Sequence, residues 1–213
     1  ATKATDSDYS SVSSSAATVV FGAASQSALS LSTTSGTYGS ALNLNTSGGS
    51  GTGSVTYSVS AGTTTCTLNN GQLTAASTGS CSVTATKASD GNYNSVSSSA
   101  TTVTFGAASQ SPLSVASTSG VYGTGLTLSY SGGSGTGSVS YSVADGTTTC
   151  TLTNGVLTVA SAGTCSVTAT RASDSNYNSV TSTAATVTFS LAPQSISFSG
   201  LRAQTLNGGA AAN

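Results

Sequence analysis

An internal repeat with a period of 84 residues constrains the fold of this chain more than any other feature. Residues 23–106 and 107–190 align without a gap and are identical at 60 of 84 positions. The same spacing places Phe21 before Phe105, so residues 1–22 match the last part of a copy. A period of this length is typical of an array of similar structural units.

Each copy is long enough to enclose a hydrophobic core of its own, which predicts separate domains in series and not a solenoid. After the second copy, Gln194 and Ser195 keep the register of the repeat, and the sequence then diverges. We therefore expect four segments, namely the C-terminal tail of a preceding repeat, two complete repeats and the start of a further, divergent module, at residues 1–22, 23–106, 107–190 and 191–213.

Alternating apolar residues predict about seven short strands in each copy. In the second copy the alternating sets are Leu113/Val115, Leu126/Leu128/Tyr130, Val139/Tyr141/Val143, Cys150/Leu152, Leu157/Val159, Cys165/Val167/Ala169 and Val187/Phe189. Asn70-Gly71 and Asn154-Gly155 suit tight hairpin turns whose central residues both have positive φ. No window places apolar residues at helical spacing. The predicted fold class is all-β, with each copy an immunoglobulin-like β-sandwich.

Each copy contains one pair of cysteines, Cys66 with Cys81 and Cys150 with Cys165. Both side chains of a pair share strand parity with apolar neighbours and should point inward. We predict one intramodule disulfide per copy, closing a loop of about 15 residues and stabilising the module by roughly 3 kcal/mol. The alternatives are reduced core cysteines and a metal or redox site. A disulfide would indicate an oxidising compartment, so the expected location is extracellular or the cell surface.

The composition argues against most chemistry. Only 4% of the residues are charged, all five acidic residues are Asp, and there is no His. General acid–base and nucleophilic catalysis depend on such groups, so we expect no enzyme activity and no catalytic residues. A metal site lacks ligands, no cofactor is expected, and there is no basic patch for a nucleic acid. The longest apolar runs are far shorter than the ~20 residues that cross a bilayer, so no membrane span is expected.

Two recurring loop motifs have ligand-binding alternatives. The glycine-rich stretch at residues 47–53 is similar to a phosphate-binding loop, but it lacks the following Lys and helix, which favours a loop between strands. The segment at residues 90–94 could hold calcium through oxygen ligands. Its structural alternative is an Asx turn entering the last strand, with Lys87 or Arg171 pairing with the adjacent Asp.

The tyrosines could form an aromatic platform for sugars. Tyr38 and Tyr122 occupy the same position in the two copies and are the candidate ligand contacts. Tyr57 alternates with valines and is better explained as a core residue, and Tyr93 as a tyrosine that covers the edge of the sandwich. The sequence favours structure over ligand binding for this group.

Two longer motifs resemble a known class of protein. They are Ser-Gly-Gly-Ser-Gly-Thr-Gly-Ser-Val-Thr-Tyr-Ser-Val at residues 47–59 and Thr-Gly-Ser-Cys-Ser-Val-Thr-Ala-Thr-Lys-Ala-Ser-Asp-Gly-Asn-Tyr-Asn at residues 78–94. Both are similar to the bacterial Ig-like tandem repeats of large secreted and surface adhesin-type proteins, over nearly all of residues 1–190. The segment from Gln194 to Leu206 resembles the opening of a related Ig-like repeat type. The resemblance implies extracellular modules that act as spacers or adhesive stalks.

We therefore expect a non-catalytic structural segment that forms the rod or stalk of a bacterial surface adhesin, or an extracellular fibre. The incomplete segments at residues 1–22 and 191–213 could complete sandwiches in neighbouring molecules by strand donation. The expected partners are neighbouring copies or adjacent modules of the same polypeptide, with a surface glycan or receptor engaged by other domains. The alternative function is a carbohydrate-binding module that uses exposed Tyr side chains.

Overall fold

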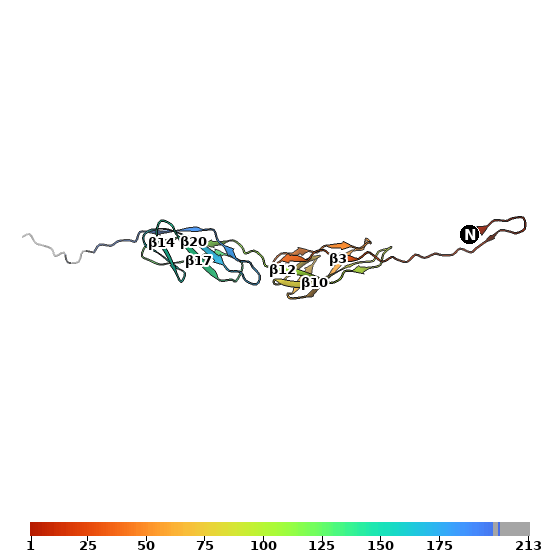
Figure 1. Ribbon diagram of the computed structural model, residues 1–213, viewed down its shortest axis with the longest axis horizontal. Helices are drawn as coiled ribbons and strands as arrows, with labels where there is room; N and C mark the ends of the chain where they lie inside the picture. Colours follow the sequence, from red (N-terminus) through yellow and green to blue (C-terminus); the bar gives the residue numbers. More distant parts are fainter. Residues whose placement is uncertain (198–199, 201–213) are drawn as a thin grey trace, which may run out of the picture. The chain divides into compact units, whose positions relative to one another are not determined.

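The computed structural model describes residues 1–197 and Gly200 (Figure 1). The described part contains strands, turns and bends and no helix. Its contacts divide it into two compact units. The first unit contains Ala1–Ser109 together with Ser175–Asn178, and the second contains Gln110–Asp174 and Ser179 onward. Each unit is therefore built mainly from one copy of the repeat, although residues 107–109 and Ser175–Asn178 of the second copy group with the first unit.

Two layers of strands form the sandwich of the first unit. One layer contains β4, β12, β10, β7 and β11, and the other contains β5, β9 and β8 together with the β3–β6 pair, of which β3 packs against β10. The bounds of these strands are β3 Leu29–Leu31, β4 Ser35–Thr37, β5 Leu42–Asn43, β6 Thr46–Gly48, β7 Val55–Ala61, β8 Cys66–Asn69, β9 Gln72–Ala75, β10 Gly79–Lys87, β11 Val96–Ser97 and β12 Thr101–Gly106.

The second unit repeats this topology strand for strand. The bounds of its strands are β13 Leu113–Val115, β14 Ser119–Val121, β15 Leu126–Thr127, β16 Tyr130–Gly132, β17 Val139–Asp145, β18 Cys150–Thr153, β19 Val156–Val159, β20 Gly163–Arg171, β21 Val180–Thr181 and β22 Ala185–Ser190. All-β sandwich modules with two layers confirm the predicted fold class. The predicted number of about seven strands is too low, because each copy has ten, several of them only two or three residues long.

The chain changes layer near the start of each copy. β3 pairs with β6 in one layer, and a short connection then carries the chain to β4, which pairs with β12 in the other. β4 and β12 are parallel, whereas every other strand pair within the sandwich is antiparallel among the described residues. The second and the last strand of a module are therefore hydrogen-bonded side by side and run in the same direction.

The side chains between the two layers form one hydrophobic core in each unit. In the first unit the buried members are Leu31, Leu44, Leu73, Val83, Val103 and Phe105, and in the second they are Leu113, Val115, Leu128, Leu157, Cys165, Val167, Ala169, Val187 and Phe189. Burying one side chain such as Phe or Leu stabilises a fold by about 1.5–3 kcal/mol. Phe105 and Phe189 are the largest, at 1% and 2% exposure, and both lie on the last strand of their module.

The hairpin turns at the end of the β8–β9 and β18–β19 pairs follow from their sequence. Asn70 and Gly71 both have positive φ, at 48° and 78°, and Asn154 and Gly155 repeat this at 50° and 79°. Asn tolerates this left-handed conformation and Gly adopts it without strain. The predicted primed turns are confirmed.

The alternation of Leu126, Leu128 and Tyr130 predicted one strand, and the structure has two. β15 pairs with β19, whereas β16 pairs with β13, so the pattern is divided between two neighbours. Leu128 is buried between them, but Tyr130 is 42% exposed and does not join the core. Pairing with other strands divides this segment into two strands, and the alternation of apolar residues does not predict that pairing.

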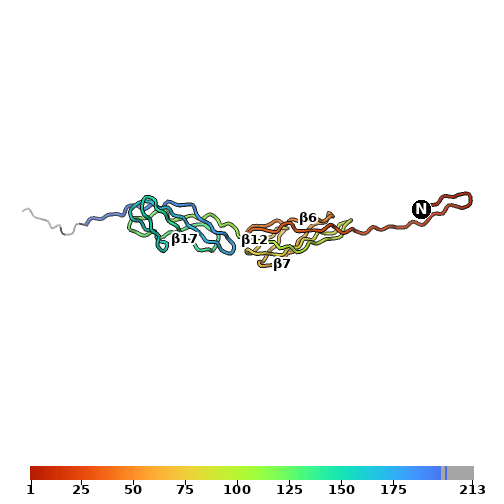
Figure 2. Tube along the Cα trace, in the orientation of Figure 1, coloured from red at the N-terminus to blue at the C-terminus, as the bar shows by residue number. Residues whose placement is uncertain are grey.

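Residues 1–22 keep only part of the module structure. β1 (Thr2–Lys3) and β2 (Val12–Ser13) form a hairpin, which lies at the red end of the tube in Figure 2. The following residues run on without strand pairing, and Phe21 is 91% exposed. At the other end, Leu191 and Ile196 are exposed and residues 191–197 form no strand. Most of the further module predicted at residues 191–213 lies outside the described residues.

Candidate functional site

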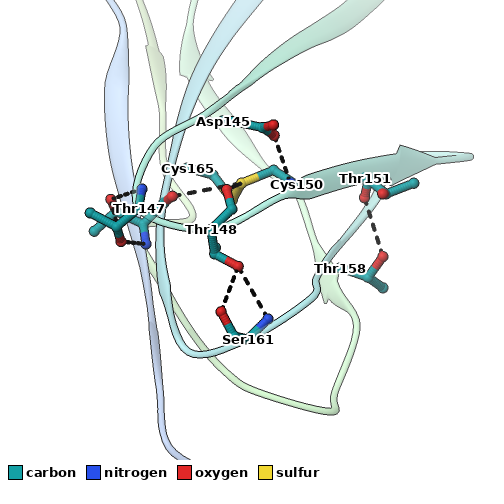
Figure 3. The surroundings of a disulfide bond; sticks show 9 residues. Asp145, Thr147, Thr148, Cys150, Thr151, Thr158, Ser161 and Cys165 are labelled. Atoms are coloured by element: carbon teal, nitrogen blue, oxygen red, sulfur yellow. Dashed lines mark hydrogen bonds between the residues drawn. A yellow bond between two sulfur atoms is a disulfide. The ribbon is translucent and has the colours of Figure 1, made fainter.

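The disulfides join the two layers of each sandwich. Cys66 on β8 is bonded to Cys81 on β10, with their Cα atoms 6.3 Å apart. Cys150 on β18 is bonded to Cys165 on β20 in the same way, at 6.0 Å. Figure 3 shows the second bridge between its two strands. The predicted intramodule pairing is therefore confirmed as part of the fold, and each bridge encloses a sequence separation of 15 residues.

Hydroxyl groups close the loops next to each disulfide. The Thr148 and Ser161 hydroxyl oxygens lie 2.9 Å apart, and the Ser161 N–H donates to the Thr148 hydroxyl oxygen at 3.1 Å (Figure 3). Thr64 and Ser77 make the same pair of contacts in the first unit. Thr64 and Thr148 are buried, so these contacts satisfy polar groups that water does not reach. The Ser/Thr-rich segments here act as structural connectors.

Near the disulfide, the second copy has an acidic residue, Asp145, that the first copy lacks. Its carboxylate oxygen Oδ1 accepts a hydrogen bond from the Cys150 N–H at 2.8 Å (Figure 3). The aligned residue in the first copy is Ala61, which has no such group. Asp145 therefore holds the start of β18 close to the end of β17 in one copy only.

Asp90 of the first copy, which aligns with Asp174 of the second, forms the turn that leads to β11 and β12. Its Oδ1 accepts from the N–H groups of Asn92 and Tyr93, both at 2.9 Å, and its Oδ2 accepts from the Thr52 N–H at 2.6 Å and the Thr52 hydroxyl at 3.1 Å. These donors, led by the Thr52 N–H and then the Asn92 N–H, lower the pKa of Asp90 to about 2, against the raising effect of its partial burial.

The Asx turn is the arrangement that the structure shows at this motif. Both carboxylate oxygens of Asp90 already accept hydrogen bonds from the chain, whereas a calcium ligand would present them to the cation. Asp6 forms the same turn in the N-terminal hairpin, with its Oδ1 accepting from the Asp8 and Tyr9 N–H groups. The turn therefore depends on its local sequence and not on a completed sandwich.

The glycine-rich loop is held against this aspartate turn by a glutamine. The Gln26 side chain donates to the backbone oxygens of Ala88 and Asn94 and accepts from the Gly51 N–H. Gln110, which is buried, makes the corresponding contacts to Ala172 and Gly135 in the second copy. The loop backbone is thus engaged by side chains of its own module, which agrees with the predicted role as a connection between strands.

The two candidate ligand-binding tyrosines differ in their surroundings. Tyr38 is half-buried, and its ring lies edge-on to the ring of Tyr177 within the first unit, with the centroids 5.5 Å apart. Tyr122 is 42% exposed, beside the exposed Val121. Tyr57 packs against the core and donates its hydroxyl hydrogen to the Leu44 carbonyl oxygen, as expected of a core residue.

A second exposed aromatic group was not among the sequence-predicted site residues. The Arg171 guanidinium lies over the Tyr130 ring, 5.2 Å from its centroid, and also donates to the backbone carbonyl oxygen of Gly135. Tyr130 also acts on a second tyrosine: the pKa of Tyr141 is raised, first by the burial of its own ring and then by its electrostatic interaction with Tyr130. Aligning the two copies could have found this pair, because Tyr130 and Arg171 replace Thr46 and Lys87 together.

The described residues contain no other concentration of reactive groups. No three side chains of the kinds that hold metal ions lie together within residues 1–197, and no pocket was found there. That part of the chain also lacks a helix of the length and apolar character needed to cross a membrane.

Comparisons with known proteins give little further information. No protein-family model and no curated protein match this chain. Among solved structures, the crystal structure of Drosophila N-cadherin EC1-4 is similar to it with a TM-score of 0.29 and 10% sequence identity. The alignment covers 77% of this chain and 51% of that chain, so this chain spans about half the length of the cadherin structure.

Proposed function

We propose that this chain is a non-catalytic structural segment of an extracellular or cell-surface protein, in which Ig-like modules, each with one internal disulfide, act in series as a spacer that carries tension. The bacterial Ig-like repeats of secreted adhesins are the class that its motifs resemble. The observation that carries the proposal is the parallel pairing of β4 with β12 and of β14 with β22.

Parallel pairing of the second strand with the last strand determines how a module responds to pulling. Tension enters a module near its first strands and leaves through its last strand. Because β14 and β22 run in the same direction, this tension slides one strand along the other and strains all their hydrogen bonds together. The Thr188 N–H to Thr118 oxygen and the Tyr122 N–H to Ser190 oxygen bonds, at 3.0 and 2.9 Å, extend this set.

The disulfide adds a second mechanical property. It excludes the residues between Cys150 and Cys165 from any stretching of an unfolded module, because the bridge connects the two ends of that loop. A residue of extended chain spans at most about 3.3–3.6 Å, so the locked loop hides roughly 50 Å of extension. Reduction should release this length without removing the β14–β22 pairing.

Single-molecule force measurement tests the proposal. We expect two unfolding events for the oxidised chain, each lengthened by roughly 50 Å after reduction. Tyr122→Pro, which removes the N–H that bonds Ser190, should lower the unfolding force of the second module, whereas the matched variant Tyr122→Ala keeps that N–H and the force. Equal forces in these two variants would argue against a tension-bearing role for this pairing.

We also propose that copies of the chain exchange strands, and this proposal rests on the exposed apolar residues near the N-terminus. Val19, Val20 and Phe21 are all more than 70% exposed, although the aligned Val103 and Phe105 are buried in the first module. Strand donation would supply the pairing partner of this segment from another copy of the chain. Growth of long species with concentration, lost in Phe21→Ser, supports donation between copies, and its absence would leave only the spacer role.

Carbohydrate binding is the second candidate function, and the exposed rings of Tyr122 and Tyr130 favour it. Aromatic side chains can stack on the apolar faces of sugar rings. Glycan-array binding that is lost in Tyr122→Ala and Tyr130→Thr, with the fold retained, would support this function. Tyr38→Ala is the control, because the Tyr38 ring is half-buried and lies edge-on against the Tyr177 ring in the first unit.

A further inference from the structure

β17 is a free edge of the second unit. It pairs with β20 through seven residues, and no strand pairs with its other side within the described chain. The backbone hydrogen bonds of the described residues do not reach that outer row of N–H and C=O groups. Such a row can bond an added strand from another molecule.

This edge lacks most of the features that usually protect edges. β17 has seven residues, whereas β14 at the other edge of the same sheet has three and β18 at an edge of the opposite sheet has four. It contains no Pro and no Lys, and the side chains on its outer face are the small, uncharged Ser140, Ser142 and Ala144. Short length, Pro and Lys are the usual means of preventing pairing between edges.

The charges at the two ends of β17 select the partner and its direction. Asp145 is at one end, and at the other end Val139 is paired with Arg171 of the neighbouring strand. If a second copy pairs antiparallel with Ser142 opposite Ser142, Asp145 of each copy lies opposite Val139 of the other copy. Val139 is itself paired with Arg171, so Asp145 and that Arg171 are two strand spacings, about 10 Å, apart. Asp145 and Arg171 share strand parity, so they lie on the same face.

We propose that β17 pairs antiparallel with β17 of a second copy of this chain, about a twofold axis at Ser142. This interface is the same patch on both molecules, and it brings together two complementary Asp145–Arg171 pairs. Parallel pairing would instead place the two Asp145 side chains next to each other. One strand pair is a small interface, so the association belongs to the weak and transient class.

The first copy provides the internal comparison. β7 has the same free edge, with Ser58 at the position of Ser142, but Ala61 replaces Asp145. The charge pairing that sets the direction is therefore absent from β7. Association should depend on β17 and much less on β7.

Sedimentation velocity of the full chain over a concentration series tests the proposal. We expect the unmodified chain to self-associate reversibly, and Ser142→Lys to abolish this by placing two ammonium groups opposite each other on the axis. Ser58→Lys, which adds the same charge to β7, should retain association. Thermal unfolding of each variant checks that the added Lys leaves the fold intact. A chain that stays monomeric at every concentration, or a Ser142→Lys variant that associates like the unmodified chain, would overturn the proposal.

Two further variants test the charges and the register. Asp145→Asn keeps an oxygen for the Cys150 N–H and removes the charge, so association should weaken roughly three- to five-fold at low salt and lose its salt dependence. Ser142→Cys should form a covalent dimer on oxidation, because directly opposed residues lie within disulfide range, whereas Ser140→Cys should not. Equal cross-linking of the two variants would contradict this register. Phe21→Ser should not affect β17 pairing, which separates this association from strand donation.

Discussion

The two complete copies show which parts of the sequence the module requires. They differ at 24 of 84 positions, the remaining 60 being identical, yet of the nine buried apolar residues in each only Leu31 and Val115 differ. The disulfide, the hydrogen bonds from the glycine-rich loop to the aspartate and the Asn-Gly hairpin are the same in both. The exchanges concentrate on exposed positions, so the fold depends on the core and a few local motifs, and the surface is free to diverge.

Three exchanges change surface chemistry as well as composition. Thr46 and Lys87 of the first copy become Tyr130 and Arg171, which contact each other, and Ala61 becomes Asp145, which accepts from Cys150. The two modules therefore have one scaffold and different surfaces. Each can serve as the control for a change made in the other, when stability is measured module by module.

The largest expected effect is the loss of one disulfide. Cys66→Ala with Cys81→Ala should lower the free energy of unfolding of the first module by about 3 kcal/mol, because the unfolded chain regains the freedom of a 15-residue loop. Hydrogen exchange with mass spectrometry, resolved to peptides of each module, gives the two stabilities separately. The second module should be unchanged, and an equal loss in both would show that the modules unfold together.

Much of the fold could be predicted from the sequence because its signals are local. Alternation marked most strands, the Asn-Gly pairs marked two turns, and strand parity oriented the cysteines. β14 was missed because Ser119-Gly120-Val121 has no alternation and is held by parallel pairing to β22, far along the chain. The exposure of Tyr130 was missed for the same reason, since its pairing partner lies on β13. Long-range pairing leaves no periodic signal in a short segment.

The second largest effect should come from the glycine that faces the core phenylalanine. A Cβ at Gly36 would lie 2.8 Å from Cε1 of Phe105, and one at Gly120 would lie 2.6 Å from Cε1 of Phe189. Gly36→Ala should therefore destabilise the first module by about 1–3 kcal/mol, as overpacking does. Gly91→Ser is the matched control, because Gly91 faces open space and Ser175 takes its place in the second copy. Similar stability losses in the two variants would refute the packing explanation.

A smaller effect should follow from exchanging the surface pair between copies. Tyr130→Thr should lower the stability of the second module by about 0.5–1 kcal/mol, the usual contribution of an exposed cation–π contact. Thr46→Tyr combined with Lys87→Arg should transfer this gain to the first module. A double-mutant cycle with Arg171→Lys measures the coupling directly. Additive effects in that cycle would mean that the ring and the guanidinium do not stabilise each other.

The smallest effect concerns Asp90, because its contribution to stability changes with pH only in acid. Its folded pKa of about 2 lies below the ordinary value of 3.8, because backbone N–H groups stabilise the carboxylate. A lowered folded pKa contributes stability that is present above the unfolded pKa and is lost as the pH falls through the folded pKa. The stability of the first module should therefore fall as the pH is lowered from 3.8 to about 2.

Carbon-13 NMR of the Asp90 carboxyl group gives this pKa directly, and the stability of Asp90→Asn at the same pH values should depend less steeply on pH. Thr52→Val removes the hydroxyl donor and keeps the Thr52 N–H, so it should retain most of the pKa shift. A near-normal pKa in Thr52→Val would show that the hydroxyl, and not the backbone N–H of the glycine-rich loop, stabilises the carboxylate and connects the two loops.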